Sequence, residues 1–539
     1  MAGSSPRTQA GPWLLLGALL VALLLLHLTF LPGIGPYGID GSYYFQTARH
    51  VAEGRGILTS VSLYHQGLRH MPQPSNIYPL WVLVLGWTGR LIGLTRAANV
   101  LPQILFVADL LLLFLLTRRI TAALDSERSR IPFASLPVLE SGHLMVLLFG
   151  LNSVFFTSTL FPYTEGIAFT TIFACLLFVS RLSRGPNLAA AALAGAFSQL
   201  CFLARSQSIL MPIAVAAAIA IVAIRRKSYW LPLVLFLVAA AAVIAPWLLY
   251  VTSFVKPFSI ANLIQLYSDT PGLLPFQHTV RTDSVPAYVL DRLSGLLVAV
   301  DPTSPYSFAA SFGPAAYIPL IGAVLFAARI RSDWRQIFDP RRLLLVATCF
   351  SGLATTLVLV EAHHSFFLPW YFGYRHGLTY VLLIALTVPY VLGQNRQWLR
   401  VLTLLMLLVS MIIGTSKSVW FVTHPRREGP TASEVQMVKW LDSQTPVPTV
   451  LTTNAQILSV YSRSNFHWTT CDETATKTRQ MLQLLPIDYV LVYSFERNCP
   501  FARGLSDVME PRYQFGKGEE SVYVFRSKLR SSRAIPARR

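Results

Sequence analysis

Long apolar segments constrain this chain more than any other feature of its sequence. Several have 17 or more nearly uncharged residues, enough to cross the roughly 30 Å hydrocarbon core of a bilayer as an α-helix. The chain is 53% hydrophobic and 13% charged, about half the charged fraction of a soluble protein. The sequence therefore predicts an α-helical polytopic membrane protein with about eleven transmembrane helices, over residues 12–32, 98–117, 143–160, 165–182, 187–204, 207–224, 229–251, 311–328, 343–361, 376–393 and 400–418.

Basic residues are concentrated in every second loop between these segments. Together with Arg7, the basic loops are 118–130, 181–184, 225–227, 329–342 and 396–400. The positive-inside rule then places the N-terminus in the cytoplasm and the C-terminus outside. This dispersed pattern also explains the formal net charge of +19, so no nucleic-acid partner is expected.

Residues 1–426 form the predicted transmembrane catalytic domain, which has two large outer loops. The first runs from 33 to 97 and includes the apolar segment 79–94. That segment is short and carries Arg90, and counting it as a span would break the alternation of basic loops. We therefore interpret it as an interfacial helix. The second outer loop is 252–310, which is rich in proline and glycine.

The composition changes to that of a soluble protein at residues 427–530. Helices are expected at 433–442 and 476–485, and strands at 447–453, 488–493 and 521–525. This alternation predicts a small α/β extracytoplasmic domain, followed by a basic tail at 531–539. If the domain lies outside the cell, Cys471 and Cys499 could pair as a disulfide.

Two carboxylates lie at the predicted outer surface. Asp40 follows the first span, and Glu165 begins the fourth after a very short loop. A lone carboxylate of either kind is usually a helix cap or a solvated charge. Two held close together could divide the work, with Asp40 deprotonating an acceptor hydroxyl and Glu165 orienting that group or a metal.

Two arginines are expected on the same side of the membrane. Arg205 lies in a tight turn between two apolar helices, and Arg375 precedes another span. A guanidinium suits a phosphate because it binds bidentately, although either arginine could simply pair with a carboxylate. The candidate substrate-binding residues are therefore Arg205 and Arg375, together with the nearby Tyr43, Tyr44, Tyr371 and His376.

No cofactor is expected, and a divalent metal is the minor alternative. Glu361, His363, His364 and His376 cluster in the sequence, but their spacing matches no known ligand pattern. We expect these histidines to hydrogen-bond a sugar or phosphate, or only to line the loop.

The chain resembles the GT-C superfamily of integral-membrane glycosyltransferases. More narrowly, it resembles the bacterial branch with protein O-mannosyltransferases and the aminoarabinose transferase of lipid A. The similar stretches are DGSYYFQTAR at 40–49, EGRG at 53–56, YPLW at 78–81, PYTE at 162–165 and DYVLV at 488–492. One departure concerns the first loop, where Ile39 and Gly41 flank Asp40 although many relatives have two adjacent acidic residues. That difference favours a metal-independent mechanism.

The resemblance implies an enzyme of the bacterial plasma membrane that takes a sugar from a polyprenyl phosphate in the outer leaflet. The implied reaction is an inverting transfer to an acceptor hydroxyl on a glycan, lipid or protein. Asp40 would be the base, and Arg205 or Arg375 would stabilise the departing lipid phosphate. The sequence names neither the sugar nor the acceptor.

Two rival interpretations remain. A transporter or flippase, or a polymerase-ligase, of polyprenyl-linked glycans would also need arginines for phosphate. It would not obviously need the long first loop or a terminal outer domain, and no inverted repeat is visible. A non-catalytic membrane subunit would tolerate asparagine at Asp40.

Overall fold

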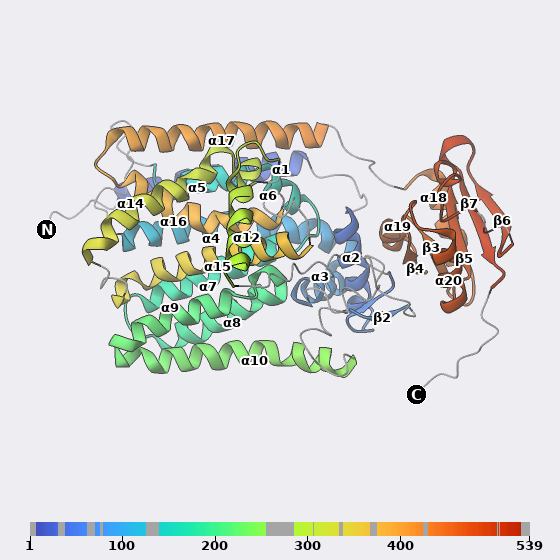
Figure 1. Cartoon of the computed structure of the whole chain (residues 1–539), viewed down its shortest axis with the longest axis horizontal. Helices are drawn as coiled ribbons and strands as arrows, with labels where there is room; N and C mark the ends of the chain where they lie inside the picture. Colours follow the sequence, from blue (N-terminus) through green and yellow to red (C-terminus); the bar gives the residue numbers. More distant parts are fainter. Residues whose placement is uncertain are drawn as a thin grey trace.

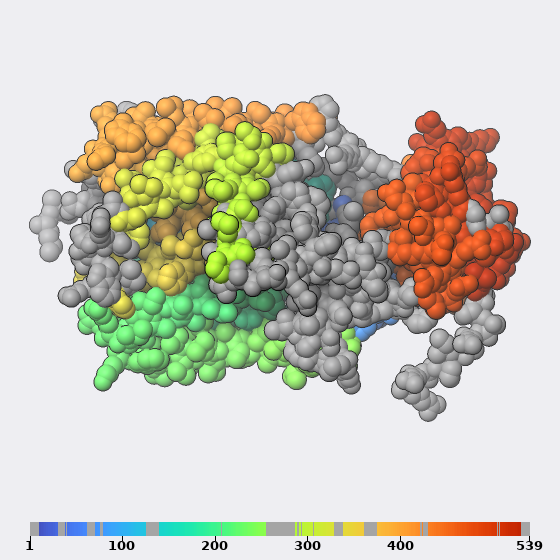
Figure 2. All heavy atoms as spheres, in the orientation of Figure 1, coloured from blue at the N-terminus to red at the C-terminus, as the bar shows by residue number. Residues whose placement is uncertain are grey.

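A computed structural model describes most of the chain (Figure 1). It shows a long helical bundle with a separate sheet-containing lobe at one end, and the space-filling view shows the same two parts (Figure 2). The described residues are 7–30, 38–61, 71–75, 79–124, 139–254, 285–305, 307–333, 338–366, 375–423, 430–503, 505 and 507–529.

Long apolar helices build the bundle, as the length and hydropathy of their segments require. The principal helices are α1 (Arg7–Thr29), α4 (Leu94–Ala123), α5 (Ser141–Gly150), α6 (Ser153–Leu160), α7 (Glu165–Leu182), α8 (Leu188–Ala204), α9 (Met211–Arg225), α10 (Trp230–Phe254), α12 (Val285–Val300), α13 (Phe308–Phe312), α14 (Ile318–Asp333), α15 (Leu343–Phe366), α16 (Val381–Leu392) and α17 (Gln397–Thr423).

Each of the eleven expected spans coincides with helical structure. Among the described residues, eight helices are long and apolar enough to cross a membrane, and a ninth span is possible if the bent pair α5 and α6 counts as one. The remaining two expected spans are the shorter apolar helices α8 and α9. The chain is therefore a multi-pass α-helical membrane protein.

The span expected at 143–160 is not one continuous helix. It breaks at Asn152 into α5 and α6, which are bent by 62° relative to each other. The Asn152 side chain accepts hydrogen bonds from the backbone N–H groups of Val154 and Phe155, both at 3.0 Å, and so caps α6. Its Nδ2 donates to the carbonyl of Ser311 at 2.8 Å, which ties the break to the other half of the bundle.

Helices differ in how deeply they lie within the bundle. Most of α7 is buried, whereas α10 and α17 lie along opposite sides in Figure 1 and expose most of their apolar side chains. In a membrane protein such exposed apolar faces meet lipid. The central position of α7 matters because its first residue is Glu165.

The first outer loop has a fold of its own between the bundle and the lobe. It contains α2 (Gly38–Ala52), the two-residue strands β1 (Leu58–Thr59) and β2 (Gln73–Pro74), and α3 (Pro79–Ile92). With 14 residues, α3 is about 21 Å long and, like α8 and α9, it is one of the shorter apolar helices. The large second loop is described only from residue 285 onward, where α12 begins.

The C-terminal lobe is a five-stranded mixed sheet with strand order β4-β3-β5-β7-β6. Strand β3 pairs in parallel with β4 and β5, whereas β7 pairs antiparallel with β5 and β6. Cys471 and Cys499 form a disulfide bond. The elements are α18 (Ala432–Asp442), β3 (Thr449–Thr452), α19 (Ala455–Tyr461), β4 (Asn465–Trp468), α20 (Ala475–Leu484), β5 (Tyr489–Tyr493), β6 (Met509–Phe515) and β7 (Val522–Ser527).

The lobe is joined to the first outer loop by backbone pairing and by one arginine. Val61 forms a parallel bridge with Phe466 on the edge strand β4, and the Phe466 N–H donates to the Ser60 carbonyl at 2.8 Å. From α2, Arg49 donates to the backbone carbonyls of Ser459, Val460 and Ser462. We call these contacts the domain junction. They connect the lobe to the helix that carries Asp40.

Candidate functional site

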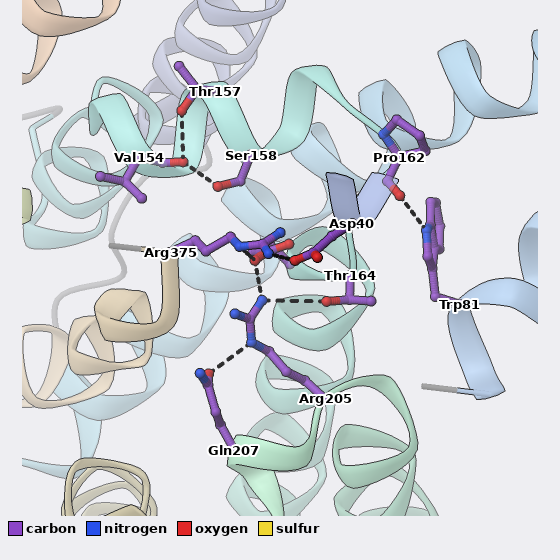
Figure 3. A network of polar contacts seen from close by, with 11 residues as sticks. Asp40, Trp81, Val154, Thr157, Ser158, Pro162, Thr164, Arg205, Gln207 and Arg375 are labelled. Carbon is purple, nitrogen blue, oxygen red and sulfur yellow. Dashed lines mark hydrogen bonds and ion pairs between the residues drawn. The ribbon is translucent and has the colours of Figure 1, made fainter. Parts of the chain in front are cut away.

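Four charged side chains meet at one end of the bundle, and Figure 3 labels three of them, Asp40, Arg205 and Arg375. They come from four separate segments: Asp40 from the first turn of α2, Glu165 from the start of α7, Arg205 from the end of α8, and Arg375 from the start of η8 (Arg375–Tyr380). All are largely buried, with exposed side-chain fractions of 18%, 1%, 6% and 10% respectively. The sequence predicted that these four would share one surface, and the structure brings them into contact.

Arg375 bridges the two carboxylates. Its Nη2 forms an ion pair with Asp40 Oδ2, and its Nε lies 3.4 Å from Glu165 Oε1. Both carboxylates also lie at helix N-termini, where the backbone N–H groups favour a negative charge. An ion pair with a guanidinium favours the ionised form of a carboxylate, which is the form that can accept a proton.

Arg205 holds the other side of Glu165. Its Nη1 forms an ion pair with Glu165 Oε1 and lies 3.4 Å from Thr164 Oγ1, to which it donates. Its Nε donates to Gln207 Oε1 at 2.8 Å. The site therefore contains two cations and two anions and is close to neutral. An anionic ligand that engages an arginine would compete with a carboxylate for it.

The backbone around Tyr163 fixes the approach of α2 to α7. The Arg375 guanidinium carbon lies 4.6 Å from the centre of the Tyr163 ring, within the range of a cation–π contact. Gly38, which starts α2, has φ of +67°, and a Cβ there would collide with the Tyr163 hydroxyl. Trp81 on α3 donates from Nε1 to the Pro162 carbonyl at 2.7 Å. The PYTE segment is thus held by both helices of the first outer loop.

Tyr43 and Tyr44 lie in the core of the first outer loop. Their exposed fractions are 1% and 3%, and their rings meet edge to face with centroids 6.3 Å apart. The Tyr43 hydroxyl is hydrogen-bonded to Ser75 Oγ at 3.0 Å, and burial raises the pKa of Tyr43. These contacts indicate a packing role for both rings. The prediction that they bind substrate has no support in this geometry.

The other predicted binding residues are placed only in part. His376 follows Arg375 in η8 and is half-buried beside the four charges. Tyr371 lies outside the described residues, and so do the side chains of Glu361, His363 and His364. Within the described part of the chain, no group of three or more His, Cys, Asp or Glu side chains could hold a metal ion.

Three residues of the site had not been singled out from the sequence. Tyr163 and Thr164 belong to the PYTE segment, and Gln207 lies two residues after Arg205. Their proximity to Glu165 and Arg205 in the chain was the available signal. Arg49 carried no such signal, because its partners are backbone carbonyls more than 400 residues away.

Comparison with known proteins identifies the fold from structure alone. No protein-family model matches the sequence, and no curated protein matches it in sequence. The oligosaccharyltransferase AglB from Archaeoglobus fulgidus, in complex with an inhibitory peptide and a dolichol-phosphate, is similar with a TM-score of 0.54 and 11% identity. That similarity covers 97% of this chain and 75% of AglB. A crystal structure of the A. fulgidus oligosaccharyltransferase with zinc and sulfate gives 0.55 and 11%, over 94% and 72%.

ArnT from Cupriavidus metallidurans, bound to undecaprenyl phosphate, gives a TM-score of 0.43 and 13% identity, over 95% of this chain and 97% of ArnT. The bacterial branch expected from the sequence stays a prediction. The archaeal similarities extend over nearly the whole chain, through the bundle, the first outer loop and the lobe. The chain has the GT-C fold that its sequence led us to expect.

Proposed function

We propose that this protein is an inverting glycosyltransferase that moves a sugar from a polyprenyl-phosphate donor to an acceptor hydroxyl at the outer face of the membrane. The observation that carries the proposal is the contact of Asp40 and Glu165 with two buried arginines at one end of a GT-C bundle. An oligosaccharyltransferase of the same fold has been solved with a dolichol-phosphate, a lipid of the proposed donor class.

The proposed reaction needs a base and a cation. Asp40 takes the proton of the acceptor hydroxyl as its oxygen attacks the anomeric carbon opposite the phosphate. The bond from that carbon to the phosphate oxygen breaks, and the polyprenyl phosphate leaves with the electron pair. Arg375 and Arg205 stabilise the departing charge. Glu165 holds both guanidinium groups in place through Oε1, so it acts as a positioning residue for the cations.

Arg375 also gives the base a resting state. Its ion pair with Asp40 occupies the carboxylate, whereas a donor phosphate would draw the guanidinium toward itself. The base would then be released when the donor is bound. This order of events would keep the carboxylate paired while no donor is bound.

Two observations support an outer-face location for the site. The lobe beside it contains the Cys471–Cys499 disulfide, and disulfides persist mainly in oxidising compartments. The arginine-rich loops lie at the other ends of the same helices, where Arg342 donates to the Ala123 carbonyl at the end of α4. Positive loops of this kind face the cytoplasm.

The test is transfer by purified protein. Radiolabelled undecaprenyl-phosphate mannose, glucose, galactose and arabinose would be supplied with membrane-extracted lipid, glycan and protein acceptors, with and without a chelator. Wild type would be compared with Asp40→Asn and with Asp507→Asn, a matched change at an exposed ion pair of the lobe. We expect Asp40→Asn to retain donor binding and to lose roughly 10²–10⁴-fold in turnover, while Asp507→Asn transfers normally.

Each outcome has a clear meaning. Equal turnover in wild type and Asp40→Asn would reject Asp40 as the base. Loss of transfer with chelator would reject the metal-independent mechanism. If wild type binds these lipids but transfers none, a liposome assay of lipid translocation would test the flippase alternative directly.

A further inference from the structure

Gln207 has an orientation that its neighbour determines. A guanidinium can only donate hydrogen bonds, so the Gln207 amide atom that faces Arg205 Nε at 2.8 Å must be the carbonyl oxygen. The amide NH₂ group therefore points away from that contact. Figure 3 shows Arg205 between Gln207 on one side and the Asp40–Arg375 pair on the other.

Within the described part of the chain, the donors of this amide are buried without a partner. Gln207 is 6% exposed, and its Nε2 has no hydrogen-bond partner among the described residues. The Oε2 atom of Glu165, which is 1% exposed, also lacks one within the described chain, although Oε1 takes both arginines. Ser208 Oγ, next to Gln207, is in the same condition. Each such atom costs about 1–3 kcal/mol if it remains unsatisfied.

These groups have the chemistry of a sugar subsite. Gln207 offers two N–H donors and Glu165 offers an acceptor oxygen, while every sugar hydroxyl can both donate and accept. Both residues bind Arg205, so the N–H donors of Gln207 and the acceptor oxygen of Glu165 belong to side chains that contact the same guanidinium, a cation suited to phosphate. An oxygen-rich ring attached to a phosphate would satisfy them together.

We propose that Gln207 and the Oε2 atom of Glu165 bind hydroxyl groups of the transferred sugar, and that Gln207 determines which sugar is accepted. This inference rests on the proposed function, because it assigns the sugar end of the same donor. A site built to hydrogen-bond a hydroxyl discriminates strongly against an analogue that lacks it, since its buried polar groups then stay unpaired.

Two substitutions separate sugar binding from support of Arg205. Gln207→Glu keeps an oxygen for Arg205 and removes the N–H donors, whereas Gln207→Met removes both. The matched control is Gln103→Glu on α4. There Oε1 is bonded to His27 Nδ1 at 2.5 Å and Nε2 also has no partner in the described chain, so the chemistry is the same without an arginine.

The measurement is the binding of two kinds of lipid by the full-length protein. The probes are undecaprenyl phosphate alone and undecaprenyl phosphate carrying mannose, glucose, galactose or arabinose. We expect wild type to prefer one sugar-bearing lipid over the sugar-free lipid by roughly tenfold or more. Both Gln207 variants should lose that preference, and Gln103→Glu should keep it. Gln207→Glu should also bind both lipids more weakly than wild type, because its carboxylate competes with the phosphate for Arg205.

A deoxy-sugar donor sharpens the test as a double-mutant cycle. Removing the hydroxyl that Gln207 contacts should weaken wild-type binding and have little further effect in Gln207→Met. Additive losses for every deoxy position would overturn the proposal. An equal fold-loss of affinity for both lipids in the Gln207 variants would also overturn it, because it would mean that Gln207 only positions Arg205. Wild type that binds the sugar-free lipid and gains nothing from a sugar would reject the subsite alone, whereas wild type that binds neither lipid would reject the proposed function.

Discussion

The arginines of the four-charge site and the arginine of the domain junction have opposite kinds of partner. Arg205 and Arg375 contact carboxylates at the end of the bundle. Arg49, which lies on the same helix α2 as Asp40, donates to three neutral backbone carbonyls in the lobe. A carboxylate can exchange its arginine for a proton or an anionic ligand, whereas a carbonyl accepts the same hydrogen bonds throughout a reaction. The kind of partner, more than the burial of the charge, therefore distinguishes the arginines of the candidate site from an arginine with a structural role.

The largest expected effect is at Arg375. We predict that Arg375→Leu lowers turnover by about 10²-fold or more, because it removes a cation from the departing phosphate and leaves two buried carboxylates without their bridge. Arg375→Lys should recover part of the loss, since it keeps the charge but cannot span both carboxylates as the fork does. The measurement is single-turnover transfer by folded, donor-saturated protein. Near-normal turnover in Arg375→Leu would mean that Arg375, like Arg49, has a structural role only.

A smaller effect is expected at Arg205. Lysine there cannot reach Glu165 Oε1, Thr164 and Gln207 at once, so Arg205→Lys should cost roughly tenfold in transfer efficiency. For undecaprenyl phosphate without a sugar, Gln207→Met in the same protein should then add little, because the Arg205–Gln207 contact has already gone. Measuring the dissociation constant of that lipid in both backgrounds checks this coupling. Independent, multiplicative losses of affinity would contradict the shared network.

At the domain junction we expect an effect on stability before any on chemistry. Arg49→Ala removes three charge-assisted hydrogen bonds and should weaken docking of the lobe by on the order of 2 kcal/mol. Hydrogen exchange of the Phe466 N–H, which pairs with the Ser60 carbonyl, reports that docking directly. Arg463→Ala, an exposed arginine of the same lobe, is the control for lost charge. Unchanged exchange at Phe466 would show that strand pairing alone holds the lobe.

The same contrast explains what the sequence could predict. Length and apolarity are properties of single segments, so all eleven expected segments are helical, but among the described residues only eight or nine spans are long and apolar enough to cross a membrane. The break at Asn152 was not predicted, because its cause is a polar cap within an apolar run. In the lobe, β3 and β5 are buried almost continuously and β7 alternates in part, and all three were expected. Strand β6 was missed because it is an exposed edge strand that includes Pro511, which weakens the strand pattern.

The site was predictable where charge conflicted with its surroundings. Asp40, Glu165, Arg205 and Arg375 all stand beside apolar segments, where an ionised group is costly unless paired. Their pairing was not predictable, because it depends on how four separate helices pack. The burial of Tyr43 and Tyr44 was not predictable in the same way, because it also depends on the packing of the first outer loop. Their role in substrate binding stays a prediction.

The smallest expected effect is a loss of stability of the domain junction at acidic pH, with no effect at neutral pH. His50 on α2 is 4% exposed and bonded through Nε2 to Ser60 Oγ at 2.6 Å. Burial, aided by Arg55, lowers the pKa of His50 from 6.5 to about 4, and Glu53 opposes the shift. The unfolded chain therefore binds a proton more readily than the folded one. The contribution of His50 to stability is complete above pH 6.5 and is lost as the pH falls toward 4. Protection of the Phe466 N–H, taken as its exchange rate relative to the intrinsic rate at each pH, should fall over that range in wild type and less so in His50→Gln, which cannot be protonated there. Parallel pH profiles of protection would assign the titration to another group.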